Sequence, residues 1–403
     1  MKRLLFVLPA LLFLLATANP FRAQQGPIRG CYQKNNGQLR FVQAAIDCQA
    51  SELAVAWNGK ASAIAGKKPG AGSITAVPTL GGTINIAYAI NDRGEVTGSS
   101  RLNGDLISHS FLARLNGLID LSPFNSGVPQ TIGPTSINNH GQITSGLVVN
   151  QVYFPAVFDS LAQTITTLGT FGGVSFAKVA GVATAINNKG QVVGYSFLDE
   201  FNRHAFLYAN GALTDLGSFG GYSEATDINE NGTIVGLASN TVNGFSHAFT
   251  YSNGVMTDIN PFGGNSFSTI QSQARSVNNR GDIVGEGLIP GGGSFHAFLN
   301  RNGAVTDLGT LPDGRNSYAK GINESGLIVG MADVPYQDTC FGFPCTLYKL
   351  VAVAYVNGTL IDLNNTIPSD SGWELLTAHD VNNRGQIVGE GLFNGKLRAF
   401  VLQ

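Results

Sequence analysis

The chain has 403 residues, a formal net charge of −2 and only 12% charged side chains. A near-neutral chain without a basic cluster is poorly suited to bind nucleic acid, because the phosphate backbone requires clustered Lys and Arg. The 52 glycines and the many Val, Ile, Thr and Phe residues indicate short β-strands joined by turns rather than helices.

Residues 1–23 have the pattern of an export signal peptide. A positively charged start is followed by an apolar run over residues 4–15 and by the small residues Ala16-Thr17-Ala18. Cleavage after Ala18 is favoured, with Ala23 as the alternative site and an uncleaved anchor as the alternative interpretation. No second apolar stretch is long enough to span a membrane, so we expect a secreted or cell-surface protein without a membrane span in its mature chain.

Residues 24–60 are expected to form a small β-hairpin module that contains Cys31 and Cys48, and residues 61–72 a flexible Ala/Gly/Lys linker. The module is similar to a short two-cysteine unit that precedes other bacterial surface proteins. Four cysteines in an exported chain make disulfides plausible. The short separations favour the pairs Cys31–Cys48 and Cys340–Cys345 over the other two pairings.

An internal repeat dominates residues 73–403. An apolar residue followed by Asn-x-x-Gly occurs seven times at a mean spacing of about 48 residues, near the length of a propeller blade. The repeated asparagines are Asn91, Asn138, Asn187, Asn229, Asn278, Asn323 and Asn382.

Each copy predicts four antiparallel strands. The first ends at the Asn, and a tight turn closed by glycine leads into a second strand such as Gly190 to Gly194. A variable loop precedes the third strand, for example His204 to Tyr208, and an Asn-Gly pair such as Asn210-Gly211 turns the chain into the fourth. Seven such copies predict an all-β, seven-bladed β-propeller.

The two ends of the repeat array predict how the ring closes. The last copy ends at Gln403 after a third strand, whereas residues 74–77 match a fourth strand and precede the first copy. We therefore expect the N-terminal strand to complete the last blade, which removes two open sheet edges. An open row of blades is the alternative.

The Asn-x-x-Gly and His-Ala-Phe elements, with Leu-Gly-x-Phe-Gly-Gly between copies, resemble the HAF family of bacterial extracellular repeats. The resemblance extends from about Ile74 to Gln403 and implies an exported bacterial repeat protein, without implying an activity. The second, sixth and seventh copies depart from the pattern, for example at Arg398, which suggests that the histidine is dispensable to the blade.

The repeated histidines His109, His204, His247 and His296 are the most conspicuous candidates for chemistry. They occupy one equivalent position in different blades, and sheets pack about 10 Å apart, so these histidines cannot share a metal ion. We interpret them as structural residues that hydrogen-bond locally. Asp227 opens a sequence that resembles a calcium loop, but its twelfth position is Ala238, so a structural turn is favoured and no metal or cofactor is predicted.

No motif for nucleophilic catalysis is present. Carboxylates from different blades can still meet at the central channel, and the loop carboxylates Asp199, Glu200, Asp333 and Asp338 are interpreted as solvated. The enzyme hypothesis is therefore an exported polysaccharide lyase or hydrolase with carboxylates at the channel mouth.

The favoured hypothesis is a non-catalytic propeller that binds a protein or a carbohydrate, and a purely structural spacer is a third. Turns between first and second strands are uniform, whereas loops between second and third strands vary, and binding residues tend to lie on variable loops. The longest such loop, from Met331 to Leu350, contains a predicted disulfide and four aromatic residues interpreted as the ligand-binding set: Tyr336, Phe341, Phe343 and Tyr348.

Overall fold

The computed structural model describes residues 73–403, except 105–107, 116, 122–133, 241–244, 264–270, 292, 341–342 and 357, together with three strands nearer the N-terminus. Two compact units divide the chain, Met1–Asn58 and Gly59–Gln403. The predicted signal peptide and the predicted linker over 61–72 lie outside the described residues. Within the described ranges, no helix has the length and apolar character needed to cross a membrane.

The first unit contains a three-stranded antiparallel sheet in the order β2-β1-β3. Its strands are β1 (Ile28–Gln33), β2 (Leu39–Val42) and β3 (Glu52–Trp57). The expected hairpin is formed by β1 and β2, and β3 pairs with the other edge of β1. Cys48 lies outside the described residues, so the predicted Cys31–Cys48 disulfide remains a prediction.

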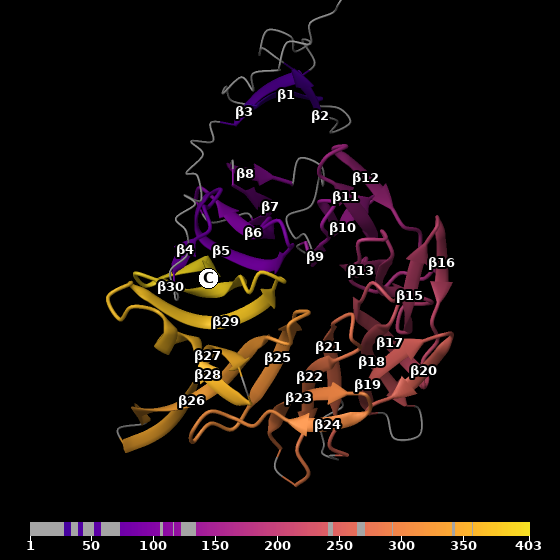
Figure 1. Cartoon of the computed structure of the whole chain (residues 1–403). Coiled ribbons are helices and arrows are strands. Elements are labelled where there is room, and N and C mark those ends of the chain that lie inside the picture. Colours follow the sequence, from indigo (N-terminus) through magenta and orange to yellow (C-terminus); the bar gives the residue numbers. More distant parts are fainter. Residues whose placement is uncertain are drawn as a thin grey trace, which may run out of the picture. The chain divides into compact units, whose positions relative to one another are not determined.

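The second unit is the predicted seven-bladed β-propeller, with seven four-stranded antiparallel sheets arranged around one axis (Figure 1). Blade 1 is β5 (Gly81–Ile90), β6 (Val96–Leu102), β7 (Ser108–Arg114) and β8 (Gly117–Asp120). Blade 2 is β9 (Ser136–Ile137), β10 (Gln142–Val149), β11 (Val152–Asp159) and β12 (Thr164–Thr167). Blade 3 is β13 (Gly181–Ile186), β14 (Val192–Phe197), β15 (Arg203–Ala209) and β16 (Ala212–Asp215).

The remaining blades follow in chain order. Blade 4 is β17 (Gly220–Ile228), β18 (Ile234–Asn240), β19 (Ser246–Ser252) and β20 (Val255–Asp258). Blade 5 is β21 (Ser272–Val277), β22 (Ile283–Leu288), β23 (Phe295–Arg301) and β24 (Ala304–Asp307). Blade 6 is β25 (Ser317–Ile322), β26 (Ile328–Cys340), β27 (Phe343–Val356) and β28 (Thr359–Asp362), followed by the short 3-10 helix η3 (Leu363–Thr366).

Blade 7 joins the two ends of the repeat array, as predicted. Its strands are β29 (Trp373–Val381), β30 (Ile387–Phe393), β31 (Lys396–Leu402) and the early strand β4 (Ile74–Ala76). β4 pairs antiparallel with β31, with Phe400 opposite Ala76 and Leu402 opposite Ile74. The ring is therefore closed by backbone hydrogen bonds between β4 and β31, which complete the outer edge of the last blade.

Glycine at the end of each second-strand motif permits a bulge in the neighbouring first strand. In β18, a Cβ on Gly236 would lie 2.0 Å from the carbonyl oxygen of Glu224, so a side chain there would collide with β17. Six of the seven blades have this glycine. In the same six blades the register of the first strand shifts between the residues that lie four and two positions before the repeated Asn. Blade 2 has Ser145 instead, and its short β9 pairs with β10 without a register shift.

Apolar side chains fill the space between neighbouring blades. The phenylalanine of the His-Ala-Phe element is fully buried in five blades, as Phe111, Phe206, Phe249, Phe298 and Phe400. The core clusters that contain Phe249 and Phe206 also include residues of the preceding blade, so blades pack face to face. Because five of the blades bury one large ring close to small Ala residues, interblade packing explains both the phenylalanine and the alanine of the motif.

Candidate functional site

The repeated asparagines hold the turns at one mouth of the channel. Asn91 Oδ1 accepts hydrogen bonds from the backbone N–H groups of Arg93 and Glu95, each at 3.0 Å. The same two contacts, to the second and fourth following residues, recur for all seven asparagines. Each side-chain oxygen therefore fixes the tight turn within its own blade.

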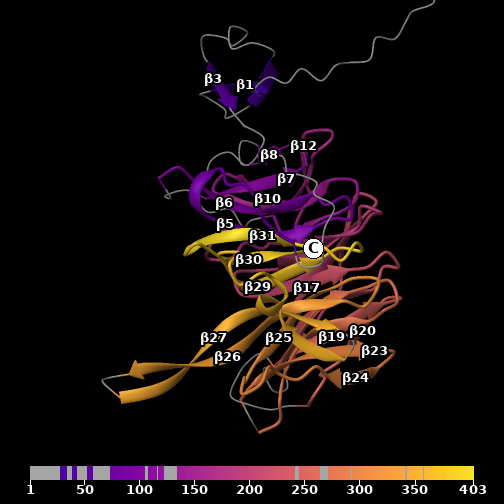
Figure 2. The same cartoon turned by 60° about the vertical axis from the view of Figure 1, so that its left-hand side comes forward.

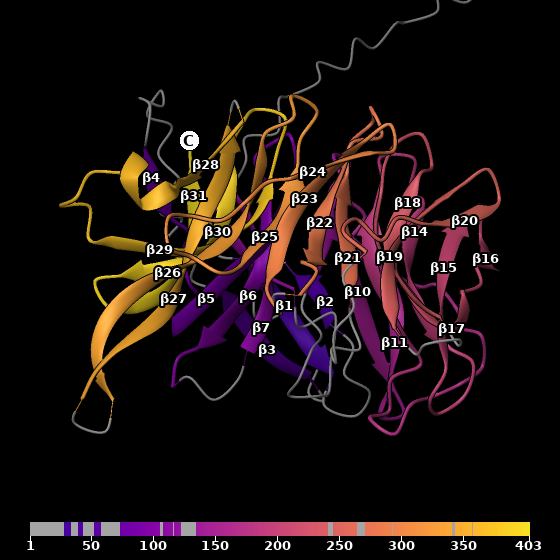
Figure 3. The ribbon, with the colours of Figure 1, turned by 90° about the horizontal axis from the view of Figure 1, so that it is seen from below.

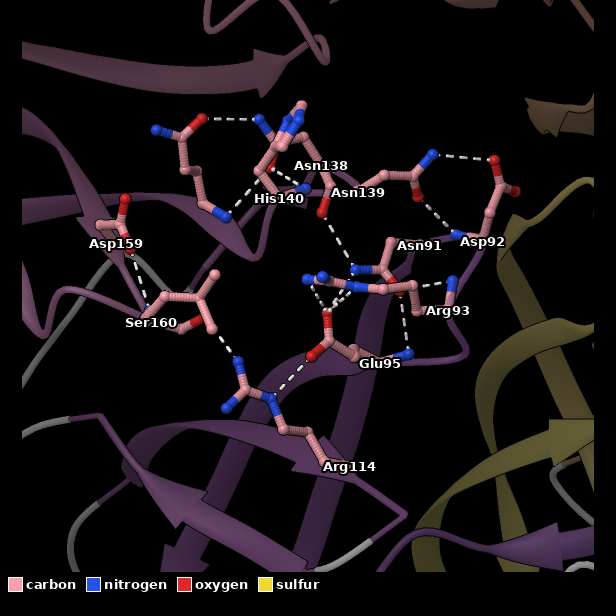
Figure 4. Close-up of polar contacts among 12 residues, drawn as sticks. Asn91, Asp92, Arg93, Glu95, Arg114, Asn138, Asn139, His140, Asp159 and Ser160 are labelled. Atoms are coloured by element: carbon pink, nitrogen blue, oxygen red, sulfur yellow. Dashed lines mark hydrogen bonds and ion pairs between the residues drawn. The ribbon is translucent and has the colours of Figure 1, made fainter. Parts of the chain in front are cut away.

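The amide nitrogen of each asparagine bonds the next blade. Asn91 Nδ2 donates to the carbonyl oxygen of Asn138 at 3.0 Å (Figure 4). The series continues around the ring until Asn382 Nδ2 donates to the carbonyl oxygen of Asn91, and the seven distances are 2.9–3.2 Å. We call this closed series the Asn ring, and its members are Asn91, Asn138, Asn187, Asn229, Asn278, Asn323 and Asn382.

A second ring lies beside the first, one residue later in each blade. The backbone N–H of Asp92 donates to Asn139 Oδ1, and Figure 4 shows Asn139 Nδ2 returning a hydrogen bond to Asp92. Equivalent bonds of 2.7–3.0 Å connect all seven blades. The side chains that accept them are those of Asp92, Asn139, Asn188, Glu230, Asn279, Glu324 and Asn383.

The carboxylates at this mouth are thus occupied by backbone donors. Burial opposes ionisation of Asp92, but hydrogen bonds from Asn139 and Asn383 outweigh it and hold the pKa of Asp92 below its ordinary value. The two rings line a small polar cavity of about 200 Å³. The polar and charged side chains at this mouth therefore hold neighbouring blades together.

Two further aspartates lie just inside the Asn ring and also bridge blades. Asp227 Oδ2 accepts from Ser276 Oγ and from the backbone N–H of Val277, and Asp380 Oδ2 accepts from the N–H of Ile90. Burial raises the pKa of Asp227 and raises that of Asp380 to about 6. The structural interpretation of Asp227 is supported, although its contacts reach the next blade rather than the turn itself.

A larger cavity of about 430 Å³ lies deeper in the channel and is lined by the residue three positions before each repeated asparagine. In the six bulged blades this is the residue at the register shift, so the bulge turns its side chain toward the axis. We call these residues the channel set: Tyr88, Thr135, Thr184, Thr226, Arg275, Lys320 and His379.

Three consecutive blades place threonine in the channel set. Thr135, Thr184 and Thr226 each donate their hydroxyl proton to the carbonyl oxygen of the alanine in the next blade, at 2.7–2.8 Å. These threonines therefore satisfy the carbonyl groups that the bulges expose, and they line one side of the cavity with small polar groups.

The other four blades, which are also consecutive around the ring, place large polar side chains there. Arg275 makes a salt bridge of 2.6 Å with the buried Glu286 of its own blade, and Tyr88 hydrogen-bonds Ser99 at 3.1 Å. His379 lies 3.6 Å from Glu390, and its ring packs edge-on against Tyr88 at 5.8 Å. Lys320, in the blade between Arg275 and His379, has no hydrogen-bond acceptor among the described residues.

Sequence patterns missed the channel set, although a signal was present. When the seven copies are aligned on the repeated Asn, the position three residues earlier reads Tyr, Thr, Thr, Thr, Arg, Lys, His. A position that varies in size and charge inside an otherwise uniform repeat indicates a role other than building the blade. The side chain at this position points toward the axis because of the bulge. The alternation of side chains along a regular strand does not predict that direction.

The predicted binding loop is a regular two-stranded ribbon rather than an irregular loop. β26 and β27 pair without interruption from Ile328 opposite Tyr355 to Cys340 opposite Phe343, and the ribbon extends away from the seven sheets (Figure 2). The predicted disulfide between Cys340 and Cys345 is present near its tip. Figure 3 shows the same ribbon from another direction, again projecting beyond the blades.

The ribbon separates the predicted aromatic residues. Tyr336 pairs with Leu347, and Phe343 pairs with Cys340, so these side chains share one face. Tyr348 pairs with Pro335 on the opposite face, where the Arg315 guanidinium lies 4.0 Å from the ring centroid. Phe341 lies outside the described residues.

The repeated histidines are paired with aspartates inside their own blades. Each Nδ1 lies 2.7–3.0 Å from a carboxylate oxygen eleven residues later, on the adjacent fourth strand. The pairs are His109 with Asp120, His204 with Asp215, His247 with Asp258 and His296 with Asp307. The local structural role predicted for these histidines is supported, and the Thr-Asp-Leu motif supplies their partners.

Three of the four carboxylates interpreted as solvated accept hydrogen bonds, and two of them lie in β26 rather than in a loop. Asp199 accepts hydrogen bonds from Asn202 and from the backbone N–H of Phe201, which hold its pKa below the ordinary value. Asp333 accepts from the backbone of Arg315 and Asn316 and is buried rather than solvated. Asp338 accepts from the N–H of Thr339.

Comparison with known proteins extends the fold assignment but supplies no activity. A family model described as "Protein of unknown function (DUF3466)" matches residues 217–288, which contain blade 4 and the first two strands of blade 5. No curated protein matches the chain. The fold and the channel define the chain as a closed seven-bladed β-propeller with hydrogen-bonded rings of side chains around one mouth.

Several solved structures are similar to the chain at low sequence identity. The oligogalacturonate lyase of Vibrio parahaemolyticus has a TM-score of 0.51 at 10% identity, over 83% of this chain and 98% of that one. A second oligogalacturonate lyase, in complex with manganese, has a TM-score of 0.52 at 11% identity, over 82% and 92%. TolB of Acinetobacter baumannii has a TM-score of 0.40 at 11% identity, and the match covers 80% of this chain and 65% of TolB.

Proposed function

We propose that this chain is an exported, non-catalytic binding propeller that holds its ligand on the rim of variable loops. The observation that carries the proposal is the ribbon of blade 6, which presents exposed aromatic side chains beside a disulfide. Phe343 is 74% exposed and Tyr336 is 38% exposed on one face of the ribbon. Large exposed rings on a rigid projection are typical of a contact surface rather than of a folding requirement.

A carbohydrate chain is the ligand class that best fits this surface. The apolar strip on the ribbon consists of Tyr336, Leu347 and Phe343, too few side chains for the core of a stable protein interface. A second exposed pair, Phe176 and Phe201, lies on blade 3 with ring centroids 5.2 Å apart. Separate small aromatic platforms suit sugar rings that stack one at a time, and a protein partner is the alternative ligand.

An enzyme is less well supported, because the candidate carboxylates are occupied. Those at the Asn-ring mouth accept backbone hydrogen bonds from the neighbouring blade, Asp199 accepts one within its loop, and Asp333 and Asp338 of β26 accept them from Arg315 and Thr339. The structural likeness to oligogalacturonate lyases concerns the fold, at 10–11% identity. A lyase or hydrolase that uses these carboxylates would have to break the bonds that hold its blades together.

An extracellular location is part of the proposal. The signal-like start and the Cys340–Cys345 disulfide support it, since disulfides persist in oxidising compartments. The HAF-type repeat pattern supports a bacterial origin in the same way.

The test compares the full chain with a ribbon-tip deletion on a glycan array and in pull-downs from cell-wall extract. Pro335 and Tyr348 are opposite each other, so replacing residues 336–347 with Asn-Gly shortens the ribbon without changing its register. We expect glycan binding to be lost in this variant and in Phe343→Ser, and kept in the control Leu161→Ser, which changes an exposed apolar residue of blade 2 outside both aromatic pairs. Binding that survives the deletion, or degradation of a bound glycan by the full chain, would contradict the proposal.

A further inference from the structure

The channel set contains an ammonium group without a direct partner. Arg275 forms a salt bridge with Glu286 in the preceding blade, and in the following blade Glu390 lies 3.6 Å from His379, which is charged only when protonated. Lys320 lies between these two pairs with no acceptor at hydrogen-bonding distance among the described residues. Burial, and next the charge of Arg275, lower the pKa of the Lys320 ammonium, and they outweigh the opposing attraction of Glu286 and Glu390.

A partly buried ammonium without a partner is costly, and the cost is removed when an anion binds beside it. The bulge of β25 directs this lysine into the cavity of about 430 Å³, a volume within the range of about 300–1,000 Å³ typical of small-molecule sites. The sibling blades show that the fold does not require a lysine there, because Thr135, Thr184 and Thr226 occupy the same position and hydrogen-bond the backbone.

We propose that this cavity binds a single carboxylate group, with Lys320 as its counter-ion and with Arg275 and His379 on either side of Lys320 in the channel set. One ammonium group without a direct partner can form one salt bridge with one carboxylate. Glu286 and Glu390 repel any anion in the cavity, and they repel a doubly charged phosphate more strongly than a singly charged carboxylate. The site is separate from the ribbon and does not depend on the ligand proposed for the rim.

The opposite side of the cavity indicates the rest of the ligand. Thr184 and Thr226 donate their protons to backbone carbonyl groups, so their oxygen lone pairs are left to accept hydrogen bonds, whereas the oxygen of Thr135 also contacts Thr144 Oγ1 at 2.8 Å. A ligand with hydroxyl groups next to its carboxylate satisfies both sides. The chemical class is therefore a sugar acid, either free or as a uronic-acid residue within a chain.

The experiment measures binding by isothermal titration calorimetry to the full chain, with glucuronate, trigalacturonate, acetate and glucose as probes. Lys320→Thr copies the three sibling blades and is expected to fold, and Lys320→Met is a second uncharged variant of similar length. Lys189→Met is the matched control, because Lys189 is an exposed lysine on an Asn-x-x-Gly turn. We expect the sugar acids to bind the wild type and the control equally, and to bind both Lys320 variants on the order of 10- to 100-fold more weakly.

The outcomes distinguish a free sugar acid from a uronate within a chain, and the channel site from the ribbon site. Affinity for free glucuronate indicates a small sugar acid, whereas affinity for trigalacturonate alone indicates a uronate within a chain, and either supports the site. Unchanged affinity in both Lys320 variants, equal binding of glucose and glucuronate, or no binding of either acid would overturn it. The ribbon-tip deletion should leave sugar-acid binding intact, so failure of the rim proposal does not affect this result.

A thermal melt without ligand distinguishes a binding lysine from a structural one. Lys320→Thr removes an unpaired, partly buried charge, so its Tm should equal or exceed that of the wild type. A lower Tm combined with unchanged sugar-acid binding would show that Lys320 stabilises the blade and does not form a ligand site.

Discussion

Two positions in the repeat, only three residues apart, have opposite characters. The repeated Asn is the same in all seven blades, and its side chain makes one interblade bond and two turn bonds every time. The channel set varies from Thr to Tyr, Arg, Lys and His. The propeller therefore has identical residues where neighbouring blades join. It varies at the position whose side chain the backbone directs into the cavity of the channel.

Breaking the Asn ring should have the largest effect. Asn229→Ala removes two turn bonds and the bond to the carbonyl of Asn278, and it leaves the buried groups unpaired. We expect the free energy of unfolding to fall by about 3 to 4 kcal/mol, measured by urea denaturation. Lys189→Ala, at the equivalent exposed turn position of blade 3, is the control and should cost under about 1 kcal/mol. Equal losses in the two variants would show that the ring does not hold the blades.

Removing the bulge should have the next largest effect. Gly236→Ala places a Cβ 2.0 Å from the Glu224 carbonyl oxygen and 2.9 Å from the Cα of Ala225, so β17 must move. We expect a loss of about 2 to 3 kcal/mol in urea denaturation. Gly211→Ala meets no atom within 4 Å and has only the strain of a positive φ of 79°, so it should cost about 1 kcal/mol. A smaller loss for Gly236→Ala than for Gly211→Ala would contradict the role assigned to this glycine.

The smallest effect concerns Asp380, beside the Asn ring. Because burial raises its pKa to about 6 in the folded chain, the folded state binds more protons than the unfolded state between about pH 4 and pH 6. Stability should therefore fall as the pH rises through this range, and Asp380→Asn should reduce that dependence. Melting temperatures from pH 4 to 8 measure it, with the exposed Asp370→Asn as control. An unchanged pH profile in Asp380→Asn would rule this assignment out.

The sequence determined the architecture because the signals for it are local. The Asn-x-x-Gly turns, the Asn-Gly pairs and the strand motifs each act within about ten residues, and they predicted seven blades and the pairing of residues 74–76 with 400–402. The His–Asp pairs are local in the same sense, since the two residues face each other across one hairpin and are eleven positions apart.

Only the tertiary structure decided what the repeated positions do. The acceptor for each asparagine amide belongs to another blade more than forty residues away, and that for Asn382 lies 291 residues away, so no local pattern identifies it. The direction of Lys320 depends on a bulge, which a uniform strand pattern conceals. The Met331–Leu350 segment forms paired strands because its two halves hydrogen-bond along their whole length, a register that composition alone does not reveal.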